Sequence, residues 1–216
     1  MGRLTDLRPR LATERLRIEP LTHDHVELLV ELDSDAEVLR FIFGRALSRE
    51  EVVEQHLPRR LRPEGPPRGL GYWAGFEEER FVGWWSLAVD DADDRTAELG
   101  YRLRRDAWGR GLATEGSRVL LEHAFDTLGL PSVWAVTMAV NTGSRGVLAR
   151  LGMTHVRTDV EEWEDPLPGA ELGEVRYELT REEWRRGVTT SAVARPRRPA
   201  DGTSAGTASS SPRREP

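Results

Sequence analysis

The sequence of 216 residues predicts an α/β fold in which helices flank a mixed sheet. Short runs with alternating or β-branched apolar residues recur between clusters of turn residues, as β-strands do. Segments with helical apolar spacing follow capping residues such as Thr22, Ser48 and Asn141. A glycine-containing turn over residues 108–111 joins one expected strand to one expected helix. These observations predict one domain over residues 1–187.

Each element rests on a local pattern. Ser48 and Glu51 match a capping box, so a helix is expected to begin there and to continue to Leu57. Residues 58–71 are rich in Pro, Gly and Arg and are expected to form a loop. Asn141 can cap a helix that Gly152 ends. Strands are expected over residues 15–21, 71–77, 81–89, 96–103, 131–140, 154–160 and 174–180.

The composition changes near the end of the chain. Residues 188–216 contain almost no large apolar side chains and are dominated by Ala, Ser, Thr, Pro, Gly and Arg. Such a segment cannot bury enough surface to offset the entropy lost on ordering, so a disordered tail is expected.

Charge and residue usage exclude several classes of function. The net charge of -6 argues against a general nucleic-acid binder. The absence of Cys excludes disulfides, thiolate metal sites and a cysteine nucleophile. His23 and His25 lack a carboxylate cluster at ligand spacing, so no metal site is expected. No signal peptide or membrane-length apolar run is present, which predicts a cytoplasmic protein without a membrane partner.

The turn at residues 108–111 predicts an anion site. It precedes a helical pattern that includes Leu120, Leu121 and Phe125. Free N–H groups and the positive dipole end of a helix N-terminus suit a phosphate, and glycine lets the backbone approach it closely. The flanking cations are Arg104, Arg105 and Arg110. The segment is therefore interpreted as a pyrophosphate cradle.

Three motifs in order make the chain resemble the GNAT superfamily of N-acetyltransferases. Residues 108–113 occupy the coenzyme A motif Gln/Arg-x-x-Gly-x-Gly/Ala, with Gly111 and Ala113 matching and Trp108 replacing the polar first residue. Residues 141–153 are similar to Asn-x-x-Ser-x-x-Val-Leu-Glu-Lys-Leu-Gly-Phe. Residues 177–184 are typical of the branch that resembles ribosomal-protein N-terminal alanine acetyltransferases. The resemblance covers roughly residues 13–186.

The resemblance implies a mostly antiparallel sheet whose fourth and fifth strands splay apart around acetyl-CoA. It implies that pantetheine pairs with the backbone of Tyr101, Arg102 and Leu103, and that Asn141 also contacts it. The residues implied at the pyrophosphate are Trp108, Gly109, Arg110, Gly111, Leu112, Ala113 and Thr114.

Candidate catalytic residues follow from the chemistry of amine acetylation. The attacking amine must lose a proton, and Glu98 on the fourth strand is the favoured acceptor; Glu161 and Glu162 are competing carboxylates. Family members often have a tyrosine that protonates the leaving thiolate, but Leu148 stands at that position. Ser144 is the favoured substitute, assisted by Asn141. A surface role for Glu98 and a helix-capping role for Ser144 are the structural alternatives.

The predicted function is acetyl-CoA-dependent transfer of an acetyl group to a primary amine by direct attack in a ternary complex. The acceptor is a protein N-terminus or a small molecule, and a homodimer is possible. Trp84 and Trp85 should lie on opposite faces of a strand, one in the core and the other available to wall the acceptor cleft. A non-catalytic acyl-CoA sensor is the main alternative. A Rossmann-type dinucleotide-binding domain is weaker, since the glycine turn follows a middle strand.

Overall fold

A computed structural model describes residues 8–61, 69–90, 93–161 and 163–193. At its centre lies an eight-stranded sheet with the order β1-β2-β3-β4-β5-β6-β8-β7. Neighbouring strands are antiparallel except β5 and β6, which are parallel, so the predicted mixed and mostly antiparallel sheet is confirmed. The strands are β1 (Leu11–Ala12), β2 (Arg17–Pro20), β3 (Gly71–Glu77), β4 (Arg80–Asp90), β5 (Asp93–Leu103), β6 (Ser132–Met138), β7 (Thr154–Asp159) and β8 (Glu174–Thr180).

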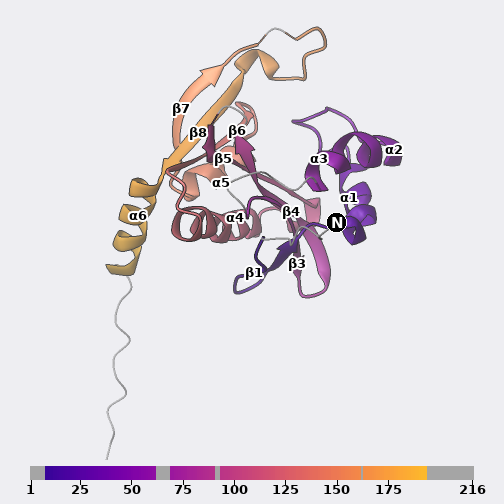
Figure 1. The fold of residues 1–216 in the computed structure, drawn as a ribbon. Helices are drawn as coiled ribbons and strands as arrows, with labels where there is room; N and C mark the ends of the chain where they lie inside the picture. The colour runs from indigo at the N-terminus through magenta and orange to yellow at the C-terminus, as the bar shows by residue number, and fades with distance from the viewer. Residues whose placement is uncertain (1–7, 62–68, 91–92, 162, 194–216) are drawn as a thin grey trace, which may run out of the picture.

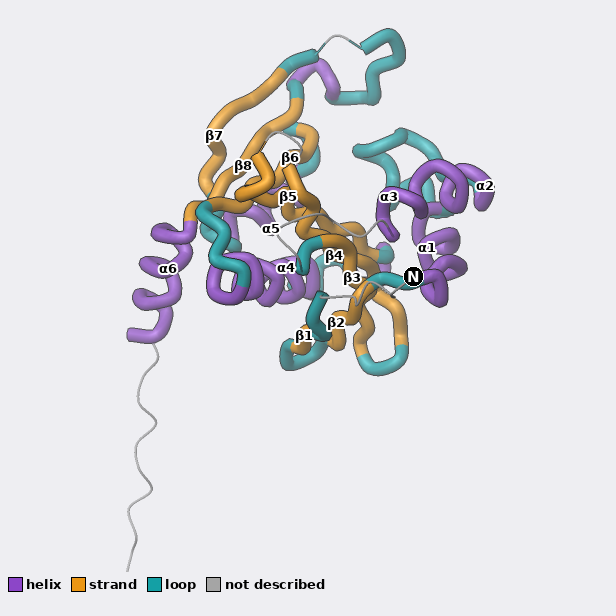
Figure 2. The backbone as a smooth tube through the Cα atoms, in the orientation of Figure 1, coloured by secondary structure: helices purple, strands orange, loops and turns teal. Residues whose placement is uncertain are grey.

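Helices cover both faces of the sheet. Figure 1 and Figure 2 show α1, α2 and α3 gathered on one side and α4 and α5 on the other. The single parallel pair, β5 and β6, is connected through α4, as parallel neighbours require a crossover. The helices are α1 (Val26–Asp33), α2 (Arg49–Glu51), α3 (Leu57–Leu61), α4 (Leu112–Glu122), α5 (Thr142–Arg150) and α6 (Arg181–Val193).

The sheet separates two apolar clusters. Trp85 is fully buried in the cluster beneath α4 and α5, whereas Trp84 belongs to the cluster beneath α1 and α3. The two adjacent tryptophans therefore lie on opposite faces, as the strand pattern predicts. A Cβ at Gly116 would lie 2.5 Å from Cε2 of Trp85, so the small residue lets α4 approach the sheet closely.

The local signals at helix starts are confirmed. The Ser48 side chain accepts from the backbone N–H of Glu51, whose carboxylate accepts from the N–H of Ser48, and this capping box opens α2. The Asn141 side chain accepts from the N–H of Ser144 at 3.1 Å and caps α5. Each of these caps satisfies backbone donors that a helix start leaves unpaired.

The helix that begins at α2 is longer than expected. A π-helical turn, Val52–His56, leads into α3, so the predicted loop from Pro58 is wrong as far as Leu61. Proline cannot donate a helical hydrogen bond, and its ring crowds the preceding turn. The wider turn just before Pro58 relieves this conflict. Residues 62–68 of the predicted loop lie outside the described residues.

The C-terminal helix α6 continues to Val193, past the predicted end of the domain at residue 187. Residues 194–216, most of the predicted tail, lie outside the described residues. None of the helices in the described ranges has the length and apolar character needed to cross a membrane.

Candidate functional site

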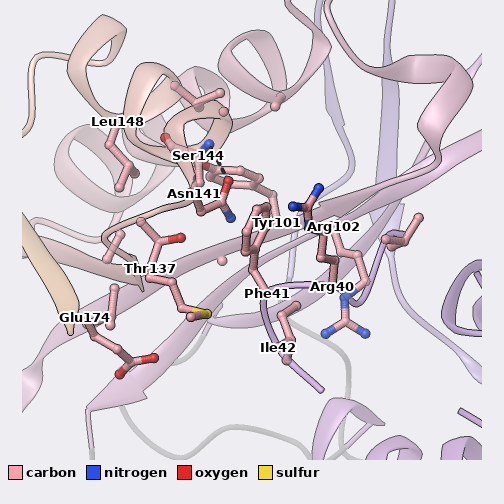
Figure 3. A pocket seen from close by; sticks show the side chains of 18 of the residues that line it. Arg40, Phe41, Ile42, Tyr101, Arg102, Thr137, Asn141, Ser144, Leu148 and Glu174 are labelled. Carbon is pink, nitrogen blue, oxygen red and sulfur yellow. Dashed lines mark hydrogen bonds between the residues drawn. The ribbon is translucent and has the colours of Figure 1, made fainter. Parts of the chain in front are cut away.

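A cleft opens where β5 and β6 part. Their ladder has only three rungs, the last joining Glu98 to Trp134. Beyond that point β5 stays paired with β4 as far as Leu103, and β6 stays paired with β8 as far as Met138. The two strands no longer pair with each other there, and an extended ligand could bind between them. Two carbonyls at the far ends are already occupied, since that of Leu103 accepts from the Trp108 indole and that of Met138 from the N–H of Asn141. The cleft has a volume of about 1070 Å³ and reaches the connection after α1, the start of α5 and the β7–β8 connection (Figure 3).

The glycine turn, predicted to be a pyrophosphate cradle, lies along this cleft, which Trp108, Gly109 and Ala113 help to line. Gly109 and Gly111 have φ angles of +70° and +81°, in the left-handed region that favours glycine. Gly111 is the N-cap of α4 and supplies no side-chain cap. The N–H of Glu115 makes the first helical bond, to the carbonyl of Gly111. The N–H groups of the preceding residues, Leu112 to Thr114, are therefore free of intrahelical partners.

The three predicted cations beside the cradle are engaged with carboxylates. Arg104 pairs with Glu31 at 2.6 Å, Arg105 with Asp35 at 2.7 Å and Arg110 with Glu77 at 2.6 Å. Each pair is at least partly exposed, so exchanging its carboxylate for a phosphate costs little.

Trp108 attaches the loop to the sheet. The residue is 48% exposed, and its indole N–H donates to the carbonyl of Leu103 at 2.8 Å. This hydrogen bond holds the loop against the end of β5, so Trp108 has a structural role at the first position of the motif.

Glu115 in the first turn of α4 is an anion close to the cradle. Its carboxylate binds the Thr13 hydroxyl and the Arg15 guanidinium. Burial alone would raise the pKa of Glu115, but these hydrogen bonds outweigh it and lower the pKa below its ordinary value. The bound cation offsets a charge that would otherwise repel a phosphate.

The predicted catalytic residues come from two elements that face the cleft. Glu98 lies on β5, and Asn141 and Ser144 lie at the start of α5; all three line the cleft. Leu148 follows Ser144 by one helical turn and also lines it. The structure thus brings the predicted group together. Glu161 lines the same cleft, whereas Glu162 lies outside the described residues.

The sequence predicted a role only for the backbone of Tyr101, but its side chain also makes a contact at the site. Its hydroxyl lies 2.9 Å from Oγ of Ser144 and 3.2 Å from the Ser144 carbonyl. Burial raises the pKa of the Tyr101 phenol to about 12, although the hydrogen bond to Ser144 opposes the shift. No short-range pattern indicates this contact, which joins β5 to α5.

Arg102 directs its side chain into a buried ion cluster. Its guanidinium donates to Asp33 at 2.5 Å, and Arg60 pairs with the other oxygen of Asp33 at 2.8 Å. Both cations pack on the Trp84 ring, whose centre is 5.4 Å from Cζ of Arg60 and 5.2 Å from Cζ of Arg102. A role for Arg102 toward a ligand in the splay therefore rests on its backbone, while Trp84 forms part of the cleft wall.

A group of carboxylates, here called the acidic wall, also lines the cleft, and of its members only Glu161 was expected from the sequence. It consists of Asp159, Glu161, Asp165 and Glu174 from β7, β8 and their connection. Loss of hydration and the nearby charges of Glu161 and Asp159 raise the pKa of Glu174 above its ordinary value. These residues are far apart from Glu98 in sequence, and only the β7–β8 hairpin brings them to the same cleft.

The described residues contain no group of three or more His, Cys, Asp or Glu side chains arranged to hold a metal ion. His25 has a structural role instead, since its Nδ1 accepts from the backbone N–H of Thr22 at 3.0 Å.

Comparison with known proteins identifies the family. The model of the acetyltransferase (GNAT) domain matches residues 15–154, which is more than half of the chain. The chain belongs to the GNAT acetyltransferase family. It is an N-acetyltransferase that depends on acetyl-CoA, and the sensor alternative is not favoured.

A curated relative and two solved structures give this membership detail. The chain is 43% identical over 187 residues to FsC-acetyl coenzyme A-N(2)-transacetylase of Aspergillus fumigatus, covering 82% of this chain and 79% of the relative. The Vibrio cholerae spermidine N-acetyltransferase in complex with CoA and spermine has a TM-score of 0.66 at 15% identity, covering 80% of this chain and 99% of the other. The ribosomal L7/L12 acetyltransferase RimL in complex with CoA has a TM-score of 0.65 at 19% identity, covering 79% and 96%. These two solved structures share the fold of this chain.

Proposed function

We propose that this GNAT enzyme transfers the acetyl group of acetyl-CoA to a primary amine of a small molecule, by direct attack in a ternary complex. The observation that carries the proposal is the cleft at the β5–β6 splay, which opens beside the uncapped N-terminus of α4. A chain without cysteine has no thiol for a covalent acetyl relay. This disfavours a covalent relay and supports direct transfer, with the donor and the acceptor in the cleft together.

The donor half of the site uses backbone groups. The pyrophosphate of acetyl-CoA would bind the N–H groups of the turn and first helical residues, with Arg110 exchanging Glu77 for a phosphate. Pantetheine would pair with the edge of β5 over Tyr101, Arg102 and Leu103, where the Leu103 carbonyl already accepts from the Trp108 indole, and Asn141 would contact it from α5. The residues assigned to the cradle are Trp108, Gly109, Arg110, Gly111, Leu112, Ala113 and Thr114.

The chemical step needs one proton acceptor and one hydrogen-bond donor. The neutral amine attacks the thioester carbon, a C–N bond forms, the C–S bond breaks, and the electron pair leaves on sulfur. We assign Glu98 to accept the amine proton, directly or through water, and to return it to solvent. We assign the Ser144 hydroxyl to donate a hydrogen bond to the departing thiolate, which solvent then protonates.

The acidic wall and the curated relative support a small-molecule acceptor. Four carboxylates attract an acceptor that arrives as an ammonium ion. The relative's name places its acetyl transfer at N(2) of FsC, and this protein is more similar to the present chain than RimL is. An N(2)-type amine is therefore favoured over a protein N-terminus.

We also propose that the protein forms a homodimer through β7. This edge strand is exposed along its whole length, and Val156 and Val160 are 48% and 64% exposed. Within the strand Arg157 pairs with Asp159 at 2.7 Å. A two-fold axis at Thr158 would set Arg157 of each strand opposite the partner's Asp159, so the two pairs would form one four-charge network across the axis. The bulge between His155 and Arg157 restricts this pairing to the residues that follow it.

A panel of amines tests the reaction. FsC, spermidine and a peptide with a free N-terminal alanine are each incubated with the protein and acetyl-CoA, and released thiol and product mass are measured. The proposal is supported if FsC is acetylated while spermidine and the peptide are poor substrates. Preferred acetylation of the peptide would overturn the acceptor assignment. Tight acetyl-CoA binding without turnover of any amine would contradict the proposed reaction. The chain contains no lysine, so self-acetylation of lysine cannot confuse the mass readout.

Two variants of Gly111 test the cradle in the same assay. Gly111→Glu adds a carboxylate where the phosphate would bind, and acetyl-CoA binding should be abolished with the fold intact. Gly111→Ala is the matched control, because it imposes the same positive-φ strain without the charge, and its Cβ would have Nη2 of Arg15 at 3.7 Å, an ordinary contact distance. Equal acetyl-CoA affinity in the two variants, measured by calorimetry, would remove the cradle from the proposal.

A further inference from the structure

The start of α5 presents one polar and one apolar side chain to the cleft. Ser144 and Leu148 are one helical turn apart, so they lie on the same face of the helix, and both line the cleft. Leu148 has no proton to donate. In this stretch of α5, a hydrogen bond to the leaving sulfur must therefore come from Ser144.

A serine hydroxyl stabilises a departing thiolate poorly unless its single proton points toward the sulfur. The hydroxyl can rotate, and it can donate in only one direction at a time. The backbone of Ser144 is fixed because its N–H donates to the Asn141 side chain at 3.1 Å. That contact leaves the direction of the hydroxyl proton undetermined.

Tyr101 supplies the missing constraint. Figure 3 shows the Tyr101 ring beneath the first turn of α5, with its hydroxyl directed at Ser144. The distance to Oγ of Ser144 is 2.9 Å, shorter than the 3.2 Å to the Ser144 carbonyl. If Tyr101 donates to Oγ, the proton of Ser144 cannot point back at Tyr101, and it remains available to the cleft.

The buried environment of Tyr101 keeps its hydroxyl protonated and so able to donate a hydrogen bond. Because burial raises the pKa of the phenol to about 12, the hydroxyl stays protonated throughout the neutral and mildly alkaline range. A phenol with this pKa is a poor acid toward a thiolate but a reliable neutral donor to another hydroxyl.

We propose that Tyr101 is a positioning residue for acetyl transfer, which donates its O–H to Oγ of Ser144 and so directs the Ser144 proton toward the departing sulfur. The inference rests on the proposed function, in which Ser144 stabilises the thiolate. Tyr101 acts only through Ser144 and exchanges no proton with the substrate.

A double-mutant cycle tests the coupling. The variants are Tyr101→Phe, Ser144→Ala and the combination of both, assayed with acetyl-CoA and the best amine of the panel. Removing one such hydrogen bond should lower kcat roughly 3- to 10-fold in Tyr101→Phe with little change in KM for acetyl-CoA. In the Ser144→Ala background the same substitution should lower kcat by less than twofold, because there is no hydroxyl left to direct.

Two further variants separate positioning from packing. Ser144→Thr keeps the hydroxyl, so Tyr101→Phe should cost as much there as in the wild-type protein. Tyr177→Phe is the matched control for loss of a phenol, since the Tyr177 hydroxyl also contacts α5, where it accepts from the Arg145 guanidinium at 3.3 Å, but Tyr177 does not line the cleft. It should leave kcat within twofold of the wild type.

The outcomes are distinct. If the Tyr101→Phe effect persists in full without the Ser144 hydroxyl, or if kcat of Tyr101→Phe stays within twofold of the wild type, the inference is overturned. If the wild-type protein acetylates no amine, the proposed function fails first. A drop in kcat for Ser144→Ala alone would retain the proposed function and remove Tyr101 from it.

Discussion

Glu98 stands at the point where the sheet divides, on the last rung of the β5–β6 ladder and beside the cleft. If it accepts the amine proton, Glu98→Gln should lower kcat about 100-fold near neutral pH. The loss should shrink as pH approaches the pKa of the acceptor amine, because more of the amine then arrives already neutral. The measurement is a pH–rate profile of both proteins.

The control for this variant is Glu178→Gln. Glu178 lies on β8, pairs with Arg176 at 2.8 Å and is absent from the lining of the cleft, so its profile should match the wild type. A Glu98→Gln profile that is parallel to the wild type at every pH would assign the base elsewhere, with Glu161 as the next candidate.

At the scale of single residues, the sequence predicts those contacts and turns that depend on residues nearby in the chain. The Asn141 cap and the Gly111 turn are each set within four residues, and both were predictable. The hydroxyl contact of Tyr101 was not, because Ser144 is 43 residues away and meets it only after α4 crosses the sheet. Arg104, Arg105 and Arg110 suggested a phosphate site, and their carboxylate partners on other elements could not be read from spacing.

Three elements are joined by the buried cluster around Asp33. Asp33, at the end of α1, is fully buried and bridges Arg60 of α3 and Arg102 of β5. Removing one partner of a buried ion pair typically costs about 3–5 kcal/mol. Asp33→Asn should therefore lower the free energy of unfolding by about this amount, since it leaves two buried guanidinium groups without their anion.

Denaturant unfolding at equilibrium checks this prediction. Glu27→Gln is the matched control, since it removes a carboxylate from the same helix, where the pair with Arg49 is well exposed. The control should change stability by less than about 1 kcal/mol. Equal effects of the two substitutions would show that the cluster contributes no more than a surface pair does.

The same cluster explains an error in the helix prediction. Proline and arginines after Leu57 indicated a loop, but α3 continues to Leu61 and so brings Arg60 to Asp33. A tertiary ion pair and the π-helical turn before Pro58 override the local signal. Buried arginine is rare enough that no sequence pattern pointed to it.

At the scale of the molecule, the two apolar clusters follow from strand alternation, which adjacent Trp84 and Trp85 already display in the sequence. The splay of β5 and β6 follows only from the family resemblance, because nothing in the alternation says where a ladder ends. The acidic wall depends on tertiary pairing instead, since Asp159 and Glu174 meet at the cleft only because β7 and β8 pair there.

The assembly proposed through β7 makes a prediction for the whole molecule. In light scattering coupled to size exclusion, the wild-type protein should have about twice the chain mass of 24.4 kDa. Arg157→Asp should weaken the dimer roughly tenfold, because it places like charges opposite each other at both ends of the two-fold pairing. Exchanging the two residues, Arg157→Asp with Asp159→Arg, restores opposite charges across the axis and should restore the dimer. A monomeric wild-type protein, or a swapped variant as weak as the single one, would rule out this edge as the interface.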